Sequence, residues 1–308
     1  MTAVIAFTFA DGTVVREDRL LNFTFRKDIY LAYTTLYASA AVDGLDPSGI
    51  TEVSLFLDGL MVHHGLIDSL TVTSSGGGSI AAVSSRSFTS LLCQNQLEPG
   101  VKFGISINAL MDSFYPLPYV THEDNSDTSS YINVEKNTTM WENIVNLTYK
   151  LTGGHPFIRS TNCVRVTQVP DPQSFSYSPA QLLTTGSAIS GKRLVSHFHM
   201  ADISGEYGHF DYEDTEVTTA KIVRHKYFDL DMQFLREPSD ALLYHDQVAF
   251  RGRRQLFCSY SGYNGEDLSD LVTFGSVQSQ RICTLTVRGS SAGIITEVGV
   301  YRDKFPRQ

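Results

Sequence analysis

Apolar and polar residues alternate along most of this chain, and a period of two predicts β-strands. The clearest run is 53–57, and Asp58-Gly59 after it favours the positive backbone angles of a tight hairpin turn. The returning strand, 60–72, contains Gly65, where we expect a β-bulge. Other strands in the first part of the chain are expected at 4–9, 14–15, 20–25, 80–85 and 101–109, with 29–41 either a strand or a short helix.

Helical signals are few. The clearest helix begins at Thr139 and Glu142, which fit a capping box, and ends at Gly153-Gly154. Shorter helices are expected at 88–95 and 179–183. The balance of Thr, Ser, Val, Phe and Tyr over Lys, Glu and Ala also favours strands, so the predicted class is mainly β with minor α.

Composition changes near residue 112 indicate a boundary. Tyr115 to Tyr119 contains two prolines, and the acidic segment 123–127 follows. The strands before it are typical of a small barrel or sandwich, and those after 205 predict a second barrel of similar size. We therefore divide the chain into 1–112, 113–205 and 206–308. The later strands are expected at 216–235 (two strands), 256–260, 271–274, 282–288 and 294–301.

The charge balance argues against a nucleic-acid-binding protein. The 308 residues carry a formal net charge of −9, whereas a protein that grips phosphates needs a basic face. One local basic cluster exists, and we interpret it as a solvated face or as interface ion pairs. Its members are Arg251, Arg253 and Arg254, with Lys221, Arg224 and Lys226 nearby.

From the cysteines and the N-terminus we expect a soluble protein that is made inside a cell. The four cysteines form no CxxC pair and are interpreted as free thiols in a reducing compartment, although a Cys258–Cys283 disulfide stays open. Residues 1–10 lack the basic lead of a signal peptide. No apolar run reaches the ~18 residues of a membrane helix, so we expect no membrane insertion.

Signals for catalysis, metals or cofactors are weak. His197 and His199, with His209 ten residues on, could bind zinc, but exposed strand histidines are the simpler interpretation. His63-His64 is interpreted as a surface or interface pair and not as a ligand pair. Walker A and GxGxxG motifs are absent from the sequence. We predict no catalytic, metal-binding or cofactor-binding residue. Two acidic groups are interpreted as solvated turns: Asp211, Glu213 and Asp214, and Glu266, Asp267 and Asp270.

Five short motifs, taken in order, resemble the phage tail or baseplate hub family, also called late-control proteins. They are Leu57-Asp58-Gly59, Gly65 to Asp68, Ser84 to Ser87, Leu91-Leu92 and Trp141 to Val145. The resemblance implies two tube-like β-barrel domains joined by a small α/β connecting region. It also implies a non-enzymatic homotrimer, without cofactors, that forms a pseudo-sixfold ring in the tails of contractile particles and related injection machines.

In that family the ring joins the tail tube to the central spike and lines the delivery channel. The resemblance therefore implies a virion protein, assembled in the bacterial cytoplasm, with the tail tube protein, the spike protein and other baseplate proteins as partners. DNA would pass the channel without specific binding, past a wall that we expect to be acidic. The hairpin tip is the expected contact between subunits or rings: Ser74, Ser75, Gly76, Gly77, Gly78 and Ser79.

Two other functions stay open at this point. The aromatic content and the acidic turns would suit a carbohydrate-binding or glycan-degrading β-rich tail component. A capsid or adhesin-like sandwich would also fit the strand pattern, and would form a pentamer or hexamer instead of a trimer.

Overall fold

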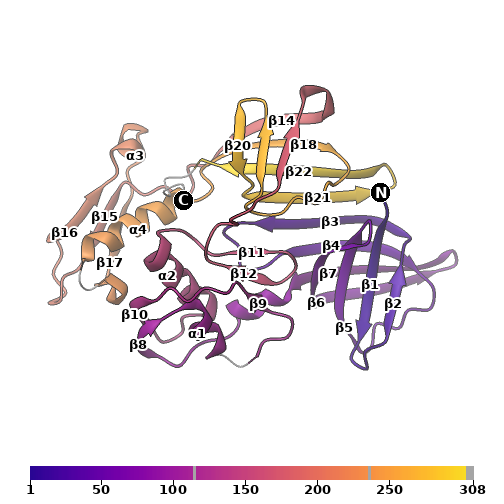
Figure 1. The fold of residues 1–308 in the computed structure, drawn as a ribbon, viewed down its shortest axis with the longest axis horizontal. Helices are drawn as coiled ribbons and strands as arrows, with labels where there is room; N and C mark the ends of the chain where they lie inside the picture. Colours follow the sequence, from indigo (N-terminus) through magenta and orange to yellow (C-terminus); the bar gives the residue numbers. More distant parts are fainter. Residues whose placement is uncertain (114–115, 235–236, 303–308) are drawn as a thin grey trace.

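One antiparallel sheet of eleven strands runs through the molecule and curls into a half-barrel (Figure 1). The computed structural model describes residues 1–113, 116–234 and 237–302. The mainly-β prediction is confirmed. In sheet order the strands are β14 (Leu182–Ile189), β18 (Arg254–Ser261), β22 (Gly293–Tyr301), β21 (Thr284–Ser290), β3 (Leu20–Asp28), β4 (Thr35–Val42), β7 (Gly78–Ser87), β6 (Leu60–Ser75), β5 (Ile50–Leu57), β1 (Ala3–Phe9) and β2 (Val14–Glu17).

Strand β3 joins the N-terminal and C-terminal halves of this sheet. It pairs with β4 on one side and with β21 on the other, from Asn22 opposite Ser290 to Asp28 opposite Thr284. One continuous apolar core lies against both halves, so the two expected barrels share a sheet and a core. Strand β14 comes from the segment 113–205 and pairs with β18. The domain boundaries themselves stay a prediction.

Period-two patterning decides which face of the sheet is buried. Phe25, Leu36, Leu55, Leu285 and Val298 are all fully buried, and each alternates with more exposed neighbours or with small polar ones. Fully burying an aliphatic or aromatic side chain contributes about 1.5–3 kcal/mol, so this face supplies most of the drive to form the sheet.

The predicted hairpin over 53–72 forms, but its bulge is not at Gly65. Asp58 and Gly59 have φ of +46° and +81°, as a tight turn with two positive angles requires. The register shifts at Val62 against β5 and at Asp68 against β7. A Cβ on Gly65 would lie 2.2 Å from the carbonyl oxygen of Arg86, so glycine is needed there because the neighbouring backbone lies too close.

The main helix was predicted correctly, and the segment 216–235 was not. Helix α2 (Met140–Thr152) has the capping box, and Gly153 ends it with φ of +68°. The two strands expected over 216–235 are wrong, because α3 (Thr215–Thr219), β17 (His225–Phe228) and the 3₁₀ helix η3 (Met232–Phe234) lie there. Asp214 caps α3 through the N–H groups of Glu216 and Val217, which overrides the strand propensity of Thr and Val.

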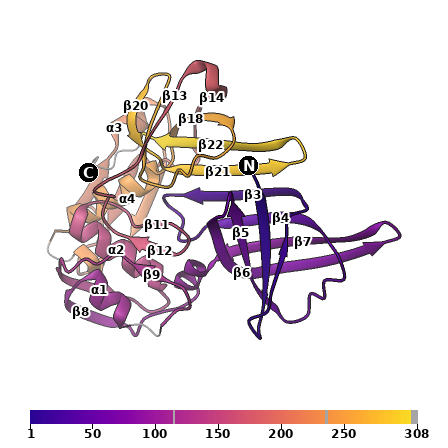
Figure 2. The same cartoon turned by 45° about the vertical axis from the view of Figure 1, so that its right-hand side comes forward.

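Two smaller lobes and a three-stranded sheet beside the large one complete the fold (Figures 1 and 2). The connecting lobe, residues 88–165, packs around Trp141, Ile144 and their neighbours. It contains η1 (Phe88–Cys93), β8 (Gly100–Ile105), α1 (Ile107–Asp112), β9 (Thr121–His122), β10 (Ser129–Val134), α2, β11 (Phe157–Arg159) and β12 (Cys163–Arg165). The small sheet is formed by β13 (Ser174–Tyr177), β19 (Leu271–Phe274) and β20 (Val277–Arg281), with η2 (Pro179–Gln181) after β13.

The outer lobe, residues 197–250, lies at the opposite end of the molecule from β1 and β2 (Figure 1). Its three-stranded sheet packs on α4 (Pro238–Phe250), a helix that the sequence pattern did not reveal. The sheet contains β15 (His197–Met200), β16 (Phe210–Glu213) and β17.

His63 lies in the core of the chain, so its interpretation as a surface or interface residue is wrong. It is fully buried, with Nδ1 2.8 Å from Thr34 Oγ1 and Nε2 2.8 Å from Ser85 Oγ. Burial, with smaller effects from His64 and Lys27, lowers the pKa of His63 from 6.5 to about 3.

This depressed pKa makes stability depend on pH. Below pH 6.5 the unfolded chain gains a proton at His63 that the folded protein does not take up until about pH 3. The free energy of unfolding is therefore expected to fall by about 1.4 kcal/mol per pH unit through this window from His63 alone. Urea titrations at several pH values should show a shallower slope for His63→Gln than for wild type. An equal slope in the two proteins would contradict this assignment.

Candidate functional site

The curled sheet has two long edges without a strand partner among the described residues. Strand β14 pairs only with β18. Strand β6 pairs with β5 up to Leu66, and beyond it the segment 67–75 pairs only with β7. These edges are the two ends of a run of eight strands, in the order β14-β18-β22-β21-β3-β4-β7-β6.

The two edges run in opposite directions. All seven neighbouring pairs in the run are antiparallel. Because the run contains an even number of strands, its first and last strands are antiparallel to each other. The β14 edge of one copy could therefore pair with the β6 edge of another and continue the antiparallel alternation without a break.

These edges lack the usual protection against pairing. Natural edge strands are often short, or carry charged residues and proline. Strand β14 has eight residues and no charge, and segment 67–75 of β6 has one charge, Asp68. Strand β2 at the far end of the sheet has four residues, of which Arg16 and Glu17 are charged. The sheet is thus protected at β2 and open at β14 and β6.

The hydrogen-bond register shows which groups on β14 face outward. The Ser190 N–H donates to the Arg253 carbonyl oxygen at 2.8 Å. Every second residue before Ser190, from Ala188 back to Thr184, therefore also points its backbone groups toward β18. The backbone N–H and C=O groups of Thr185, Ser187 and Ile189 therefore point away from β18. They are available to a strand from another chain.

The predicted contact segment, Ser74 to Ser79, forms the tip of the β6–β7 hairpin, which projects beyond the rest of the sheet (Figure 2). Pairing continues to Ser75 opposite Gly78, so only Gly76 and Gly77 form the turn. The Ser74 and Ser79 hydroxyl oxygens lie 2.8 Å apart. The role of this tip in contacts stays a prediction.

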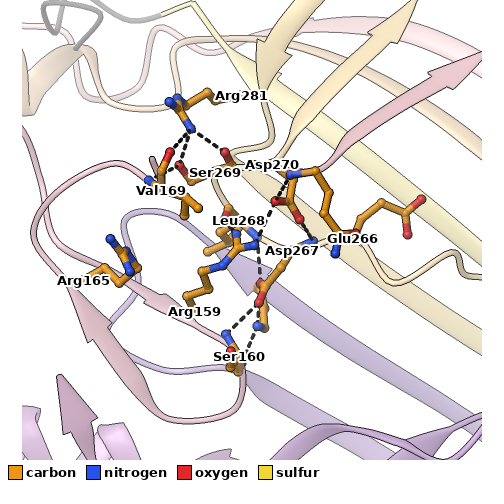
Figure 3. A network of polar contacts seen from close by, with 12 residues as sticks. Arg159, Ser160, Arg165, Val169, Glu266, Asp267, Leu268, Ser269, Asp270 and Arg281 are labelled. Atoms are coloured by element: carbon orange, nitrogen blue, oxygen red, sulfur yellow. Dashed lines mark hydrogen bonds and ion pairs between the residues drawn. The ribbon is translucent and has the colours of Figure 1, made fainter. Parts of the chain in front are cut away.

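The acidic turn 266–270 is largely buried, so its interpretation as a solvated loop is wrong (Figure 3). Asp270 is 1% exposed and accepts a hydrogen bond from Arg159 Nη2 at 2.9 Å. It also accepts from the N–H groups of Gln173 and Asp267. Arg281, which donates to the carbonyl oxygens of Val169 and Ser269, holds the same turn.

Asp267 joins this turn to two other parts of the molecule (Figure 3). One oxygen accepts from the Ser160 N–H in the connecting lobe at 2.6 Å. The other accepts from Lys27 Nζ on β3 at 2.6 Å, and Lys27 also donates to the Ser160 carbonyl oxygen. Lys27, Ser160 and Asp267 therefore fasten the N-terminal strands, the connecting lobe and the C-terminal turn at one point.

Glu266 accepts hydrogen bonds from two tyrosines. The hydroxyl groups of Tyr177 and Tyr260 both donate to Glu266 Oε1, and their rings stack with centroids 4.4 Å apart. Burial, followed by the charge of Glu266, raises the pKa of Tyr260, and burial with the Glu266 hydrogen bond raises that of Tyr177. Since the carboxylates of this turn are bound by side chains and backbone, they act as structural acceptors rather than as an acid–base pair.

In the second acidic group, Asp214 is buried, whereas Asp211 and Glu213 are exposed. Asp214 is buried as the N-cap of α3, which the sequence analysis did not anticipate. Asp211 is exposed beside His199, with Oδ1 2.6 Å from Nδ1. Glu213 lies opposite His197 across the β15–β16 pair and is exposed.

The structure does not bring His209 together with His197 and His199, the three histidines that the sequence analysis considered for zinc. His197 stacks on His225 of β17, with ring centroids 4.2 Å apart, and His199 Nε2 is 3.0 Å from His225 Nδ1. His225 was missed, because only the parallel β15–β17 register brings it there. His209 lies apart, in an exposed cluster with Asp202 and Glu206.

The four cysteines are free thiols. Strand β22 lies between β18, which carries Cys258, and β21, beside which Cys283 lies, so the two cysteines are not on neighbouring strands. Within the described ranges, no helix combines the length and the apolar character that a membrane crossing requires.

Solved structures with this fold come from phage tails and from a secretion machine. The tail protein of Neisseria meningitidis MC58 is 15% identical, with a TM-score of 0.74 over 99% of this chain and 98% of that chain. The 43 kDa tail protein of prophage MuSo2 from Shewanella oneidensis is 13% identical, with a TM-score of 0.72 over 98% of each chain.

A third structure is a component of the E. coli type VI secretion system, described as similar to bacteriophage T4 tail proteins. It is 9% identical, with a TM-score of 0.55 over 94% of this chain and 77% of that chain. No protein-family model and no curated protein matches the sequence. The likeness shows that the chain has the fold of phage tail and type VI secretion proteins over nearly its whole length.

Proposed function

We propose that this protein is a tail or baseplate hub, three copies of which form a ring between a tail tube and a central spike. The observation that carries the proposal is the pair of open, oppositely directed edges at the ends of the eight-strand run. The fold shared with phage tail proteins and a type VI secretion component supports a structural role in such a particle.

In this proposal β14 of each subunit pairs with segment 67–75 of β6 in the next. Three runs then close into one barrel, which removes the exposed edges. Each subunit would contribute two groups of four strands, one from each half of the run, and we propose that these give a threefold ring pseudo-sixfold symmetry. The projecting tip Ser74 to Ser79 would contact a neighbouring ring, such as the tail tube protein, the spike protein or another baseplate protein.

The face of the run turned away from the core would line the channel. It is rich in Ser, Thr and Ala, and several of its charges are paired: Arg86 with Asp68 at 2.7 Å, and Arg288 with Glu297 at 3.7 Å. Such a wall is closer to neutral than the acidic one that we expected from the net charge. It would still let DNA pass without binding, because its cations are neutralised.

The role is proposed as non-enzymatic and the location as the virion. The buried carboxylates of turn 266–270 support the first point, since each is occupied by structural hydrogen bonds.

The mass of the purified protein in solution tests the ring. We expect three times the 34.1 kDa chain mass by native mass spectrometry and by light scattering. A monomer at all concentrations, or a pentamer or hexamer, would contradict the proposal. A pentamer or hexamer would favour a capsid or adhesin-like sandwich.

A further inference from the structure

A basic cleft lies where the outer lobe meets the curled sheet. Two adjoining cavities of about 430 and 440 Å³ open there. They share five lining residues: Tyr30, Lys192, Arg193, Ala249 and Arg251. The cleft is bounded by the β3–β4 loop, the segment after β14, the β15–β17 sheet and the C-terminal end of α4.

The charge of this cleft is opposite to that of the whole chain. Among the described residues, Asp28 is the one carboxylate in its lining, whereas the chain carries a net charge of −9. The cations come from segments far apart in sequence, so only the fold brings them together. They are Arg26, Lys192, Arg193, Arg224, Lys226, Arg251 and Arg253.

Several of these charges are not neutralised by carboxylates. Arg224 Nη1 donates to the backbone carbonyl oxygens of Gly191, Lys192 and Leu194 at 3.0, 2.8 and 3.1 Å. These bonds fix the guanidinium but leave its charge in place. Within the described part of the chain, Lys192, Arg193 and Lys226 form no ion pair. A ligand with several negative charges would supply the missing partners.

Two partly buried histidines are consistent with a positive potential. Burial, and then the charge of Lys226, lowers the pKa of His245 in the cleft wall from 6.5 to about 4. Burial, and then the charge of Arg251, holds the pKa of His155 well below its usual value. Both imidazoles are therefore neutral at pH 7, and the cleft's charge comes from Lys and Arg.

The walls between the cations decide the class of ligand. Leu194, Val195 and Phe198 form a buried apolar floor beneath the cleft. Val248 and Ala249 are partly exposed in its wall, which suits apolar side chains better than phosphate groups. The aromatic rings are already covered: Tyr30 stacks on Tyr301 at 5.6 Å. Phe228 stacks on His245 at 4.0 Å. Since single-stranded nucleic acids bind through open aromatic faces, these covered rings disfavour them.

We propose that the cleft binds an acidic peptide segment of a partner protein. Its carboxylates would lie against Lys192, Arg193 and Lys226, and its apolar side chains against the partly exposed Val248 and Ala249. This inference does not depend on the ring, because the cleft is lined by one copy of the chain.

The test uses a short fluorescein-labelled peptide that alternates Glu and Leu, and fluorescence anisotropy with the full-length protein. We expect binding that weakens as salt is added and that weakens at least about tenfold in a peptide with Gln in place of Glu. The double variant Lys192→Glu/Arg193→Glu should weaken binding by at least about tenfold. Both residues are exposed, so the variant should fold, which circular dichroism checks.

The matched control is Lys102→Glu/Lys136→Glu, which makes the same change in net charge away from the cleft and should alter binding by less than about twofold. If the first double variant is misfolded, Lys226→Glu takes its place. Peptide binding that survives the cleft variants would overturn the proposal. So would tighter binding of an oligothymidylate, which would indicate nucleic acid, or full displacement by pyrophosphate, which would indicate a small-anion site. Failure of any of these tests leaves the mass of the wild-type oligomer unaffected.

Discussion

Replacing Asp267 with alanine is expected to lower the free energy of unfolding by about 3–5 kcal/mol, because it leaves a buried ammonium group without its counter-ion. The Lys27 side chain is 4% exposed and lies 2.6 Å from Asp267 Oδ1. The same carboxylate accepts the Ser160 N–H, which also loses its partner. Urea titration followed by circular dichroism measures the change.

Two comparisons make this prediction specific. The double variant Lys27→Met/Asp267→Leu should recover much of the loss, because replacing a buried ion pair by apolar side chains is often close to neutral. Asp43→Ala removes an exposed partner of Arg19 and should leave the urea midpoint almost unchanged, because solvent screens this pair. A similar small loss for Asp267→Ala would show that the joint between β3 and the turn does not hold the fold together.

Replacing Ser187 with proline should abolish the ring while leaving the subunit folded. The Ser187 N–H points away from β18, so proline removes no hydrogen bond within the subunit. In the proposed ring it removes one donor from the β14–β6 junction and places the proline ring against the neighbouring strand. Light scattering should give the mass of one chain, 34.1 kDa, with an unchanged circular dichroism spectrum.

Arg16→Pro is the matched control for the ring. Its N–H also points outward, since the Phe9 N–H donates to the Thr13 carbonyl oxygen and alternate residues of β2 follow that register. Strand β2 is the protected edge, so this variant should remain a trimer. If Ser187→Pro keeps the trimer, the ring closes through another surface. If both variants are monomers, β14 and β2 do not differ as an open edge and a protected edge, contrary to what their sequences suggest.

The two predictions concern one mechanical requirement. A ring closed through strand edges needs subunits whose two open edges are held at a fixed angle to each other. The joint of Lys27, Ser160 and Asp267 fastens the β3 strand, at the middle of the run, to the connecting lobe and to turn 266–270. A buried ion pair at this position restricts bending between the halves of the sheet, because bending would expose it or pull it apart.

The sequence alone determined the local structure, where neighbouring residues carry the signal. Asp58-Gly59 specified its turn, Thr139 and Glu142 specified the start of α2, and alternation specified the β21–β22 hairpin. The motif order also indicated a fold that the solved tail proteins share. The turn, the helix start and the hairpin depend on residues close together in the chain, and the motifs are short stretches of the sequence itself.

The tertiary structure decided what depends on residues far apart in the chain. Pairing of β3 with β21 merged the two expected barrels into one sheet and left β14 and β6 as its open edges. Burial turned Glu266, Asp267 and Asp270 from expected solvated carboxylates into structural acceptors. The basic cleft likewise collects cations from positions 26 to 253. Burial and long-range pairing are properties of the whole packed chain, so no local pattern could have indicated them.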